Sequence, residues 1–243
     1  MKDYEKGGAA FEKYTKVSTR TLSLNNPEMA AIDSFKIFDK RILVLGGGAG
    51  RVPLNLSLYG NKVTSIEISK SLVEFCKSKY PKTEFGNVDF LVGDAKFMES
   101  VDGYYDVVFF PMNGIDLTRN IEQRENIRSQ VSSKLNYGGY FIFASHNINA
   151  YCFSYKIGKS KRSIRNIFCK SYEFQDEAVV GGGTLFRGNP NFIIRQTQSI
   201  TNLHFCSCFY DSRNFLERKI SKFPGISKFI FPYILYAFKK EKG

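Results

Sequence analysis

Two side chains, Glu67 and His146, are placed to take part in chemistry, because Glu67 lies at the carboxyl end of one predicted β-strand and His146 lies just past the carboxyl end of another. A carboxylate accepts hydrogen bonds from ligand hydroxyl groups. An imidazole, with an ordinary pKa of about 6.5, takes up protons near neutral pH. Glu67 therefore predicts recognition of hydroxyl groups, and His146 predicts proton removal. A second reading of His146, in which it only caps its strand or bonds a neighbouring segment, stays open.

A glycine turn is the best-defined element that could place these side chains. The apolar run Ile42–Leu45 predicts a strand buried on both faces, and a helical pattern begins at Arg51. Between them lie four glycines, which let the backbone turn tightly and approach a ligand: Gly46, Gly47, Gly48 and Gly50. Strand, glycine turn and helix follow in the order of a nucleoside site.

The next strand supplies the carboxylate for such a site. Lys62–Ile68 reads as a second parallel strand with Glu67 at its carboxyl end. In a doubly wound sheet this position faces the first glycine turn, where a carboxylate can accept hydrogen bonds from both ribose hydroxyls. We expect Glu67 to bind ribose, the alternative being a solvated side chain at a strand end.

The spacing of the glycines narrows the class of nucleoside that this turn could bind. Counting from Gly46, the sixth position is Arg51, so the dinucleotide spacing G-x-G-x-x-G fails and G-x-G-x-G remains. With the strands around it, this motif resembles the class I S-adenosylmethionine-dependent methyltransferases over residues 40 to 146. Val44 stands where that family has an acidic residue. The resemblance implies S-adenosyl-L-methionine as cofactor, bound by Gly46, Gly47, Gly48, Gly50, Glu67, Ile68, Asp94, Ala95 and Pro111.

Later motifs extend the resemblance. Residues 88–95 resemble the third strand, in which Asp94 accepts a hydrogen bond from the adenine amino group and the backbone N–H of Ala95 meets the ring. Residues 105–110 resemble the fourth strand, which leads into 111–116 at the reaction edge. A helix over about 120–135, a turn at 136–139 and a fifth strand over 140–145 complete the expected core.

The fold class implied is α/β, with a doubly wound, seven-stranded, mostly parallel sheet that ends in an antiparallel hairpin, the Rossmann-like methyltransferase fold. The 243 residues, 43% of them hydrophobic, suffice for a single domain over 1–243. We expect residues 1–40 to form lid helices, 41–146 the cofactor-binding core, 147–198 a substrate-facing cap and 199–243 the last strands, at 199–210 and 233–238.

The acceptor of the methyl group is less well marked. Transfer from a sulfonium is an in-line displacement, so we expect the site mainly to position the acceptor, with His146 as base and Asn113 and Asp116 as second candidates that orient it. The basic stretch 156–170 predicts either an anionic substrate, phosphorylated or nucleotide-linked, or a solvated helical face. A small molecule or glycan, methylated at oxygen, is the expected acceptor.

Other functions are disfavoured by what the chain lacks. No Asn/Asp-Pro-Pro-Tyr/Phe motif follows the fourth strand and no cysteine lies in 111–116, so nucleic acid is a disfavoured partner despite the net charge of +12, and RNA methylation is an alternative. Polyamine aminopropyl transfer is a second alternative, although Ala49 and Pro111 stand where that family has acids. A third is a non-catalytic cofactor-binding scaffold, which the missing acid at Val44 favours.

The composition of the chain indicates where the protein is located in the cell and whether it binds a metal. No secretory signal and no apolar run of about 18 to 20 residues is present, so a cytoplasmic enzyme without a membrane span is expected. The five cysteines fit reduced thiols. Cys206 and Cys208 alternate on an expected strand, so we predict that these two residues are neighbours in the core and that they do not bind a metal.

Overall fold

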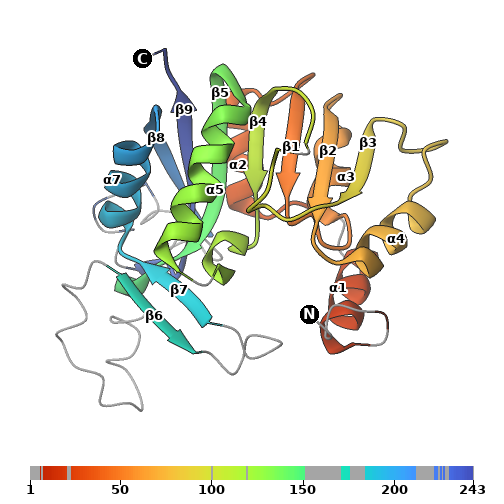
Figure 1. Ribbon diagram of the computed structural model, residues 1–243, viewed down its shortest axis with the longest axis horizontal. Coiled ribbons are helices and arrows are strands. Elements are labelled where there is room, and N and C mark those ends of the chain that lie inside the picture. The colour runs from red at the N-terminus through yellow and green to blue at the C-terminus, as the bar shows by residue number, and fades with distance from the viewer. Residues whose placement is uncertain are drawn as a thin grey trace.

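A computed structural model describes residues 6, 8–20, 23–99, 101–118, 120–150, 171–175, 184–211, 222–223, 225, 227 and 230–242. Its centre is a seven-stranded sheet of order β3-β2-β1-β4-β5-β9-β8 (Figure 1), with a separate two-stranded pair, β6 and β7. This arrangement confirms the predicted fold class, since five strands run parallel and the last two pair antiparallel.

The parallel half follows the predicted strands closely. Its strands are β1 (Arg41–Leu45), β2 (Lys62–Glu67), β3 (Val88–Val92), β4 (Tyr105–Phe110) and β5 (Leu135–His146). The helices between them are α3 (Arg51–Ser57), α4 (Lys70–Lys79) and α5 (Ile121–Lys134), with the short 3₁₀ helix η2 (Gly114–Leu117) after β4. All carboxyl ends of these strands meet at one edge of the sheet, where ligands of open α/β sheets bind.

The predicted turn at 136–139 is wrong, because these residues belong to β5, which begins at Leu135. Gly138 has a φ of +82°, and the pairing of β4 with β5 shifts register between Tyr105 and Val107. The glycines therefore make an irregularity inside one long strand, where the Gly139 backbone approaches the Asp106 carbonyl too closely for a Cβ.

The antiparallel end consists of β9 (Tyr233–Lys240) between β5 and β8 (Leu203–Tyr210). The predicted start of the sixth strand at Ser199 is wrong, because helix α7 (Pro190–Ile200) runs through it. Its buried residues Pro190, Ile193 and Thr197 recur at helical spacing. Cys206 is exposed rather than a core neighbour.

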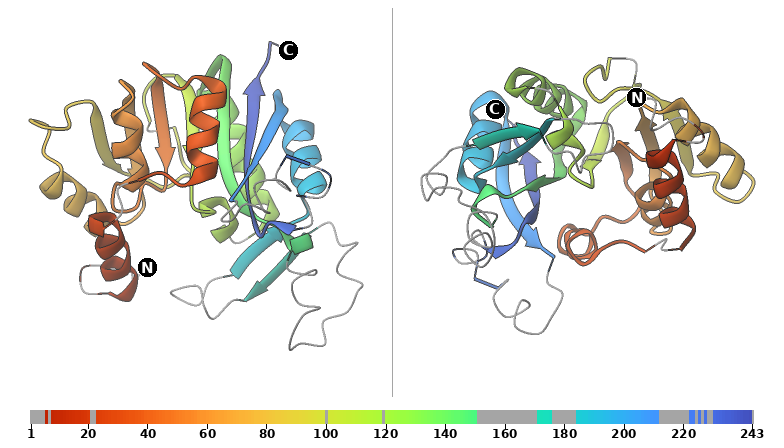
Figure 2. Two further views of the ribbon diagram at one scale, coloured as in Figure 1. Left: turned by 180° about the vertical axis from the view of Figure 1, so that it is seen from behind. Right: turned by 90° about the horizontal axis from the view of Figure 1, so that it is seen from below.

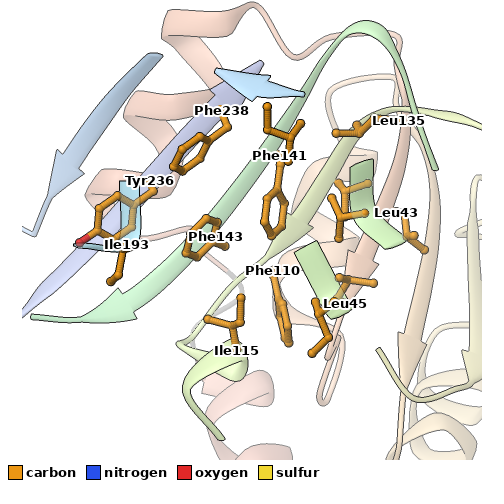
Figure 3. Close-up of a cluster of buried hydrophobic side chains, with 14 of the residues drawn as sticks. Leu43, Leu45, Phe110, Ile115, Leu135, Phe141, Phe143, Ile193, Tyr236 and Phe238 are labelled. Carbon is orange, nitrogen blue, oxygen red and sulfur yellow. The ribbon is translucent and has the colours of Figure 1, made fainter. Parts of the chain in front are cut away.

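Helices cover both faces of the sheet (Figure 2). One buried cluster joins the sheet to α5 and α7, and another joins its opposite face to α3, α4 and α2 (Asn26–Phe35). Aromatic rings fill the first cluster, where Phe143 stacks with Phe141 at a centroid distance of 4.7 Å and with Phe238 of β9 at 5.8 Å (Figure 3). This packing fixes β5 between β4 and β9 and so fixes the position of its carboxyl end.

The expected cap is described only in part. The hairpin of β6 (Ser171–Gln175) and β7 (Thr184–Gly188) projects beyond the carboxyl edge of the sheet (Figure 1), whereas α7 packs against α5 and β8. The predicted cap range 147–198 thus includes most of α7, a helix that packs on the sheet rather than in a cap. The basic stretch 156–170 and the glycines at 181–183 lie outside the described residues.

The expected lid divides into two differently placed helices. Helix α1 (Ala9–Arg20) packs on α4 through Phe11 and Phe75, and Tyr14 lies beside Gly48 of the glycine turn. Helix α2 packs against β8 and β9 instead. Closure over the cofactor therefore stays a prediction that concerns α1. None of the described helices is long and apolar enough to cross a membrane.

Candidate active site

The glycine turn is held against the end of β2. The backbone N–H groups of Gly46 and Gly47 both donate to the Ile66 carbonyl, at 2.9 and 3.1 Å. Gly46, Gly48 and Gly50 have φ values of +66°, +56° and +92°, which side chains disfavour, and a Cβ at Gly47 would collide with Ser65 Oγ. The turn thus requires glycine for two separate reasons, backbone conformation and close packing.

Glu67 lies directly against this turn, as the sequence predicts. Its Oε2 accepts the N–H of Gly48 at 2.9 Å, and its Oε1 accepts the N–H of Ser69, at the start of α4, at 3.0 Å. Each carboxylate oxygen has a second lone pair, so both can still accept a hydroxyl group. Glu67 therefore joins the two elements that would frame a ribose.

Asp94 lies at the neighbouring strand end. The N–H of Gly93 donates to the Glu67 carbonyl at 3.0 Å, which ties the end of β3 to the end of β2. Asp94 Oδ1 accepts the backbone N–H of Lys96 at 2.9 Å, and its Oδ2 lies 3.1 Å from Lys96 Nζ. Ala95 is partly buried against the core, and Ile68 is exposed beside Glu67. The proposed cofactor residues thus come together at one edge.

Val44, the departure from the family motif, is a core residue. It is fully buried in β1, opposite Ser65 of β2 and Phe109 of β4. An ionised side chain there would lose its hydration among apolar neighbours. The position that is acidic in the family motif is therefore part of the hydrophobic core in this chain.

The turn after β4 approaches the glycine turn from the other side. The ring of Phe110 lies between them: a Cβ added to Gly46 would lie 3.4 Å from it, and one added to Gly114 would collide with it. Pro111 is buried, while Met112 and Asn113 have φ values of +54° and +57°. Two successive non-glycine residues in the left-handed region are costly, and such backbones occur mainly at functional sites.

His146 and Asp116 form a buried pair at the end of β5. Asp116 Oδ2 lies 2.7 Å from both the backbone N and the Nδ1 of His146, and its Oδ1 accepts the Ser145 hydroxyl at 2.7 Å. Asp116 is fully buried, whereas 8% of His146 is exposed. The expected contact of Asp116 with an acceptor does not fit this enclosure. Instead, its carboxylate orients the imidazole.

Burial acts against the charge of this pair. It raises the pKa of Asp116, while the hydrogen bonds and charge of His146, and the Ser145 hydroxyl, act in the opposite direction. Because Asp116 holds Nδ1, the ring nitrogen that remains is Nε2, to which no described residue makes a hydrogen bond. An imidazole held by a carboxylate in this way is the usual arrangement of a general base.

Two arginines that the sequence reasoning missed lie in the core behind the pair. Arg124 and Arg128 of α5 are each only 1% exposed. Arg128 donates to Gln196 Oε1 at 3.0 Å, and Arg124 stacks over Phe186 of β7 at 3.9 Å. Burial, and next the charge of Arg124, lower the pKa of Arg128 to about 10, while Asp116 favours its charged form. Asp116 thus has buried positive charge nearby.

Comparisons with known proteins bear on the family and the fold of the chain. Residues 42–139 match a family described as a methyltransferase domain. No curated protein sequence matches the chain. Solved structures with the same fold include the CcbJ methyltransferase from Streptomyces caelestis, which is 15% identical with a TM-score of 0.63, the match covering 94% of this chain and 96% of that one.

Two further solved structures share this fold. An S-adenosylmethionine-dependent methyltransferase from Clostridium acetobutylicum is 12% identical, with a TM-score of 0.64 and coverage of 96% and 99%. The 1,6-didemethyltoxoflavin-N1-methyltransferase from Burkholderia thailandensis, solved with 1,6-didemethyltoxoflavin and S-adenosylhomocysteine, is 10% identical, with a TM-score of 0.64 and coverage of 96% and 87%. Residues 42–139 thus match a methyltransferase domain, and the solved structures show that the chain has the fold of S-adenosylmethionine-dependent methyltransferases.

Proposed function

We propose that the chain transfers a methyl group from S-adenosylmethionine to a hydroxyl group of a small molecule or glycan, and that His146 is the general base. The observation that carries the proposal is the bond between Asp116 Oδ2 and His146 Nδ1, which leaves Nε2 for the acceptor. The acceptor oxygen attacks the methyl carbon as the carbon–sulfur bond breaks, and its proton passes to Nε2. The products are the methyl ether, S-adenosylhomocysteine and a protonated imidazole.

Asn113 is the second residue that we place at the acceptor. Its Oδ1 is buried and has no hydrogen-bond partner among the described residues. A buried carbonyl oxygen without a donor is costly, and a ligand donor would remove that cost. The position of Asn113 in the turn after β4, beside the glycine turn, supports a role in holding the acceptor or the methionine end of the cofactor.

An anionic group on the acceptor fits the remaining charge of the chain. The net charge is +12, and the basic stretch 156–170 follows the strand that carries His146. We propose that this stretch holds a phosphate or nucleotide group of a small acceptor rather than RNA. Methylation of an acceptor without an anionic group, at equal efficiency and equal dependence on salt, would refute this part.

The test is methyl transfer from labelled S-adenosylmethionine into fractionated metabolites, glycans and RNA of the source cell. For the acceptor found, we compare His146→Gln with His204→Gln, a matched control because His204 is exposed on β8. Loss of a general base should lower turnover about 10²- to 10⁴-fold with unchanged cofactor affinity, whereas the control should retain wild-type turnover.

Two results would contradict the proposal. Wild-type turnover in His146→Gln would remove the base, and a methylated nitrogen in the product would remove the hydroxyl acceptor. The second result has a precedent among the similar structures, since one is a glycopeptide N-methyltransferase complexed with sinefungin. Identification of the methylated atom by mass spectrometry and NMR decides between oxygen and nitrogen.

A further inference from the structure

Tyr233 lies next to the proposed base. It is the first residue of β9 and pairs directly with His146, the last residue of β5, in the antiparallel ladder. Directly opposite residues point to the same face of a sheet. The two ring centroids are 4.7 Å apart, with 59° between the planes. The tyrosine ring therefore borders the space beside the imidazole.

The Tyr233 side chain is free to meet a ligand. Its exposed fraction is 37%, whereas the next five residues of β9 are buried. Its hydroxyl makes no hydrogen bond to any described residue, so the polar end of the ring is not used to hold the fold. A partly exposed aromatic ring thus lies beside the buried imidazole of His146, 8% of which is exposed.

Exposed apolar side chains also lie on the turn that carries Asp116. Met112 and Leu117, on either side of Asn113–Asp116, are 59% and 44% exposed. The three segments that meet here, 111–118, 144–150 and 231–236, contain no lysine, arginine or glutamate, and their one acid, Asp116, is enclosed. The segments around His146 are therefore predominantly apolar and uncharged, as the residues of small-molecule sites usually are.

We propose that the acceptor presents a flat aromatic ring that bears the reacting hydroxyl, and that Tyr233 selects this ring by stacking. This inference rests on the hydroxyl acceptor proposed above. It also fits the chemistry of the base, because a phenolic hydroxyl has a pKa of about 10, much closer to that of an imidazole than the value of about 15.7 for water. An anionic group would then lie farther along the acceptor, away from His146.

The experiment uses two probes of similar size and one hydroxyl each, 2-naphthol, which is flat, and decahydro-2-naphthol, which is not. Calorimetry measures the binding of each to the full chain in the presence of S-adenosylhomocysteine, so that no turnover occurs. We compare Tyr233→Phe, which keeps the ring, with Tyr233→Leu, which keeps apolar bulk. Tyr104→Leu is the matched control, because Tyr104 is an exposed tyrosine just before β4, at the opposite edge of the sheet.

The wild-type protein, Tyr233→Phe and Tyr104→Leu should bind 2-naphthol more tightly than the saturated probe. Tyr233→Leu should lose about three- to tenfold in affinity for 2-naphthol alone, the size of one aromatic pair. Equal affinity of the wild type for both probes, or an unchanged preference in Tyr233→Leu, would overturn the proposal. So would failure of 2-naphthol to bind a protein that still binds S-adenosylhomocysteine. The proposal that His146 is the general base is tested separately, by the turnover of His146→Gln.

Discussion

The ion pair between Glu28 and Arg51 gives the sharpest stability prediction, because it joins α2 to the helix that starts directly after the glycine turn. Glu28 is 2% exposed, and its two oxygens accept from both terminal nitrogens of Arg51 at 2.7 and 2.8 Å. Glu28 also accepts the backbone N–H of Asn25 at 2.9 Å, completing a capping box. The perturbations are Arg51→Met, Glu28→Gln and the double variant.

The magnitude follows from which group each change leaves buried. Arg51→Met leaves an enclosed carboxylate with one backbone donor and should lower the free energy of unfolding by about 3 to 5 kcal/mol. Glu28→Gln keeps one acceptor oxygen but turns an amide group toward the guanidinium, at a cost of about 2 to 4 kcal/mol. The double variant removes both charges and should cost about 2 kcal/mol less than the sum of the single changes.

Urea denaturation measures all three variants, and thermal unfolding should show single-variant midpoints lower by roughly 4 to 20 °C in a chain of this size. The exposed pair of Glu12 and Lys16 on α1 serves as the matched control, with an expected coupling of only about 0.3 to 0.5 kcal/mol. Additive single changes at Glu28 and Arg51 would refute the reasoning. In that case the bidentate contact contributes no more than a surface pair.

Two other predictions concern the cofactor edge. Glu67→Ala removes the acceptor of the Gly48 N–H and should weaken S-adenosylmethionine binding by about 1 to 3 kcal/mol in calorimetry; unchanged affinity would remove Glu67 from the site. Burial, followed by the charge of Glu67, raises the pKa of Cys76 to about 12. Since the thiolate is the reactive form, iodoacetamide at pH 8 should label the exposed Cys206 and leave Cys76 unlabelled in the native protein, as read by peptide mass spectrometry. Equal labelling of both would show that Cys76 is accessible and ionised.

The sequence predicts the parallel half of the sheet well because its signals are local. Apolar runs, a glycine turn and carboxylates at strand ends are readable within short windows, so Glu67 was placed beside Gly48 correctly. The start of β8 was placed too early because an amphipathic helix end and an alternating strand adjoin at residues 199–203. The alternating pattern of β8 extends backward into the last residues of α7, so the sequence alone does not mark where the helix ends.

The residues around His146 are harder to predict because their positions depend on long-range contacts. The enclosure of Asp116 follows from how η2 packs on β5, which no periodicity reports. Arg124 and Arg128 lie on a largely polar helix and look solvent-exposed in sequence, yet both are buried. Tyr233 could have been found from the expected topology alone, because an antiparallel last strand begins where the fifth strand ends.

The pairing of β5 with β9 has a consequence for protein synthesis. The end of β5 is held from the far side of the chain, since Asn147 donates through its backbone N–H to Pro232 O at 2.8 Å and through its side chain to Phe231 O at 2.9 Å. A ribosome must therefore make more than eighty further residues after His146 before these contacts can form. The residues of the glycine turn, Glu67 and Asp94 have emerged long before. During translation, the residues proposed to bind the cofactor would therefore be available before the proposed base could be held in place.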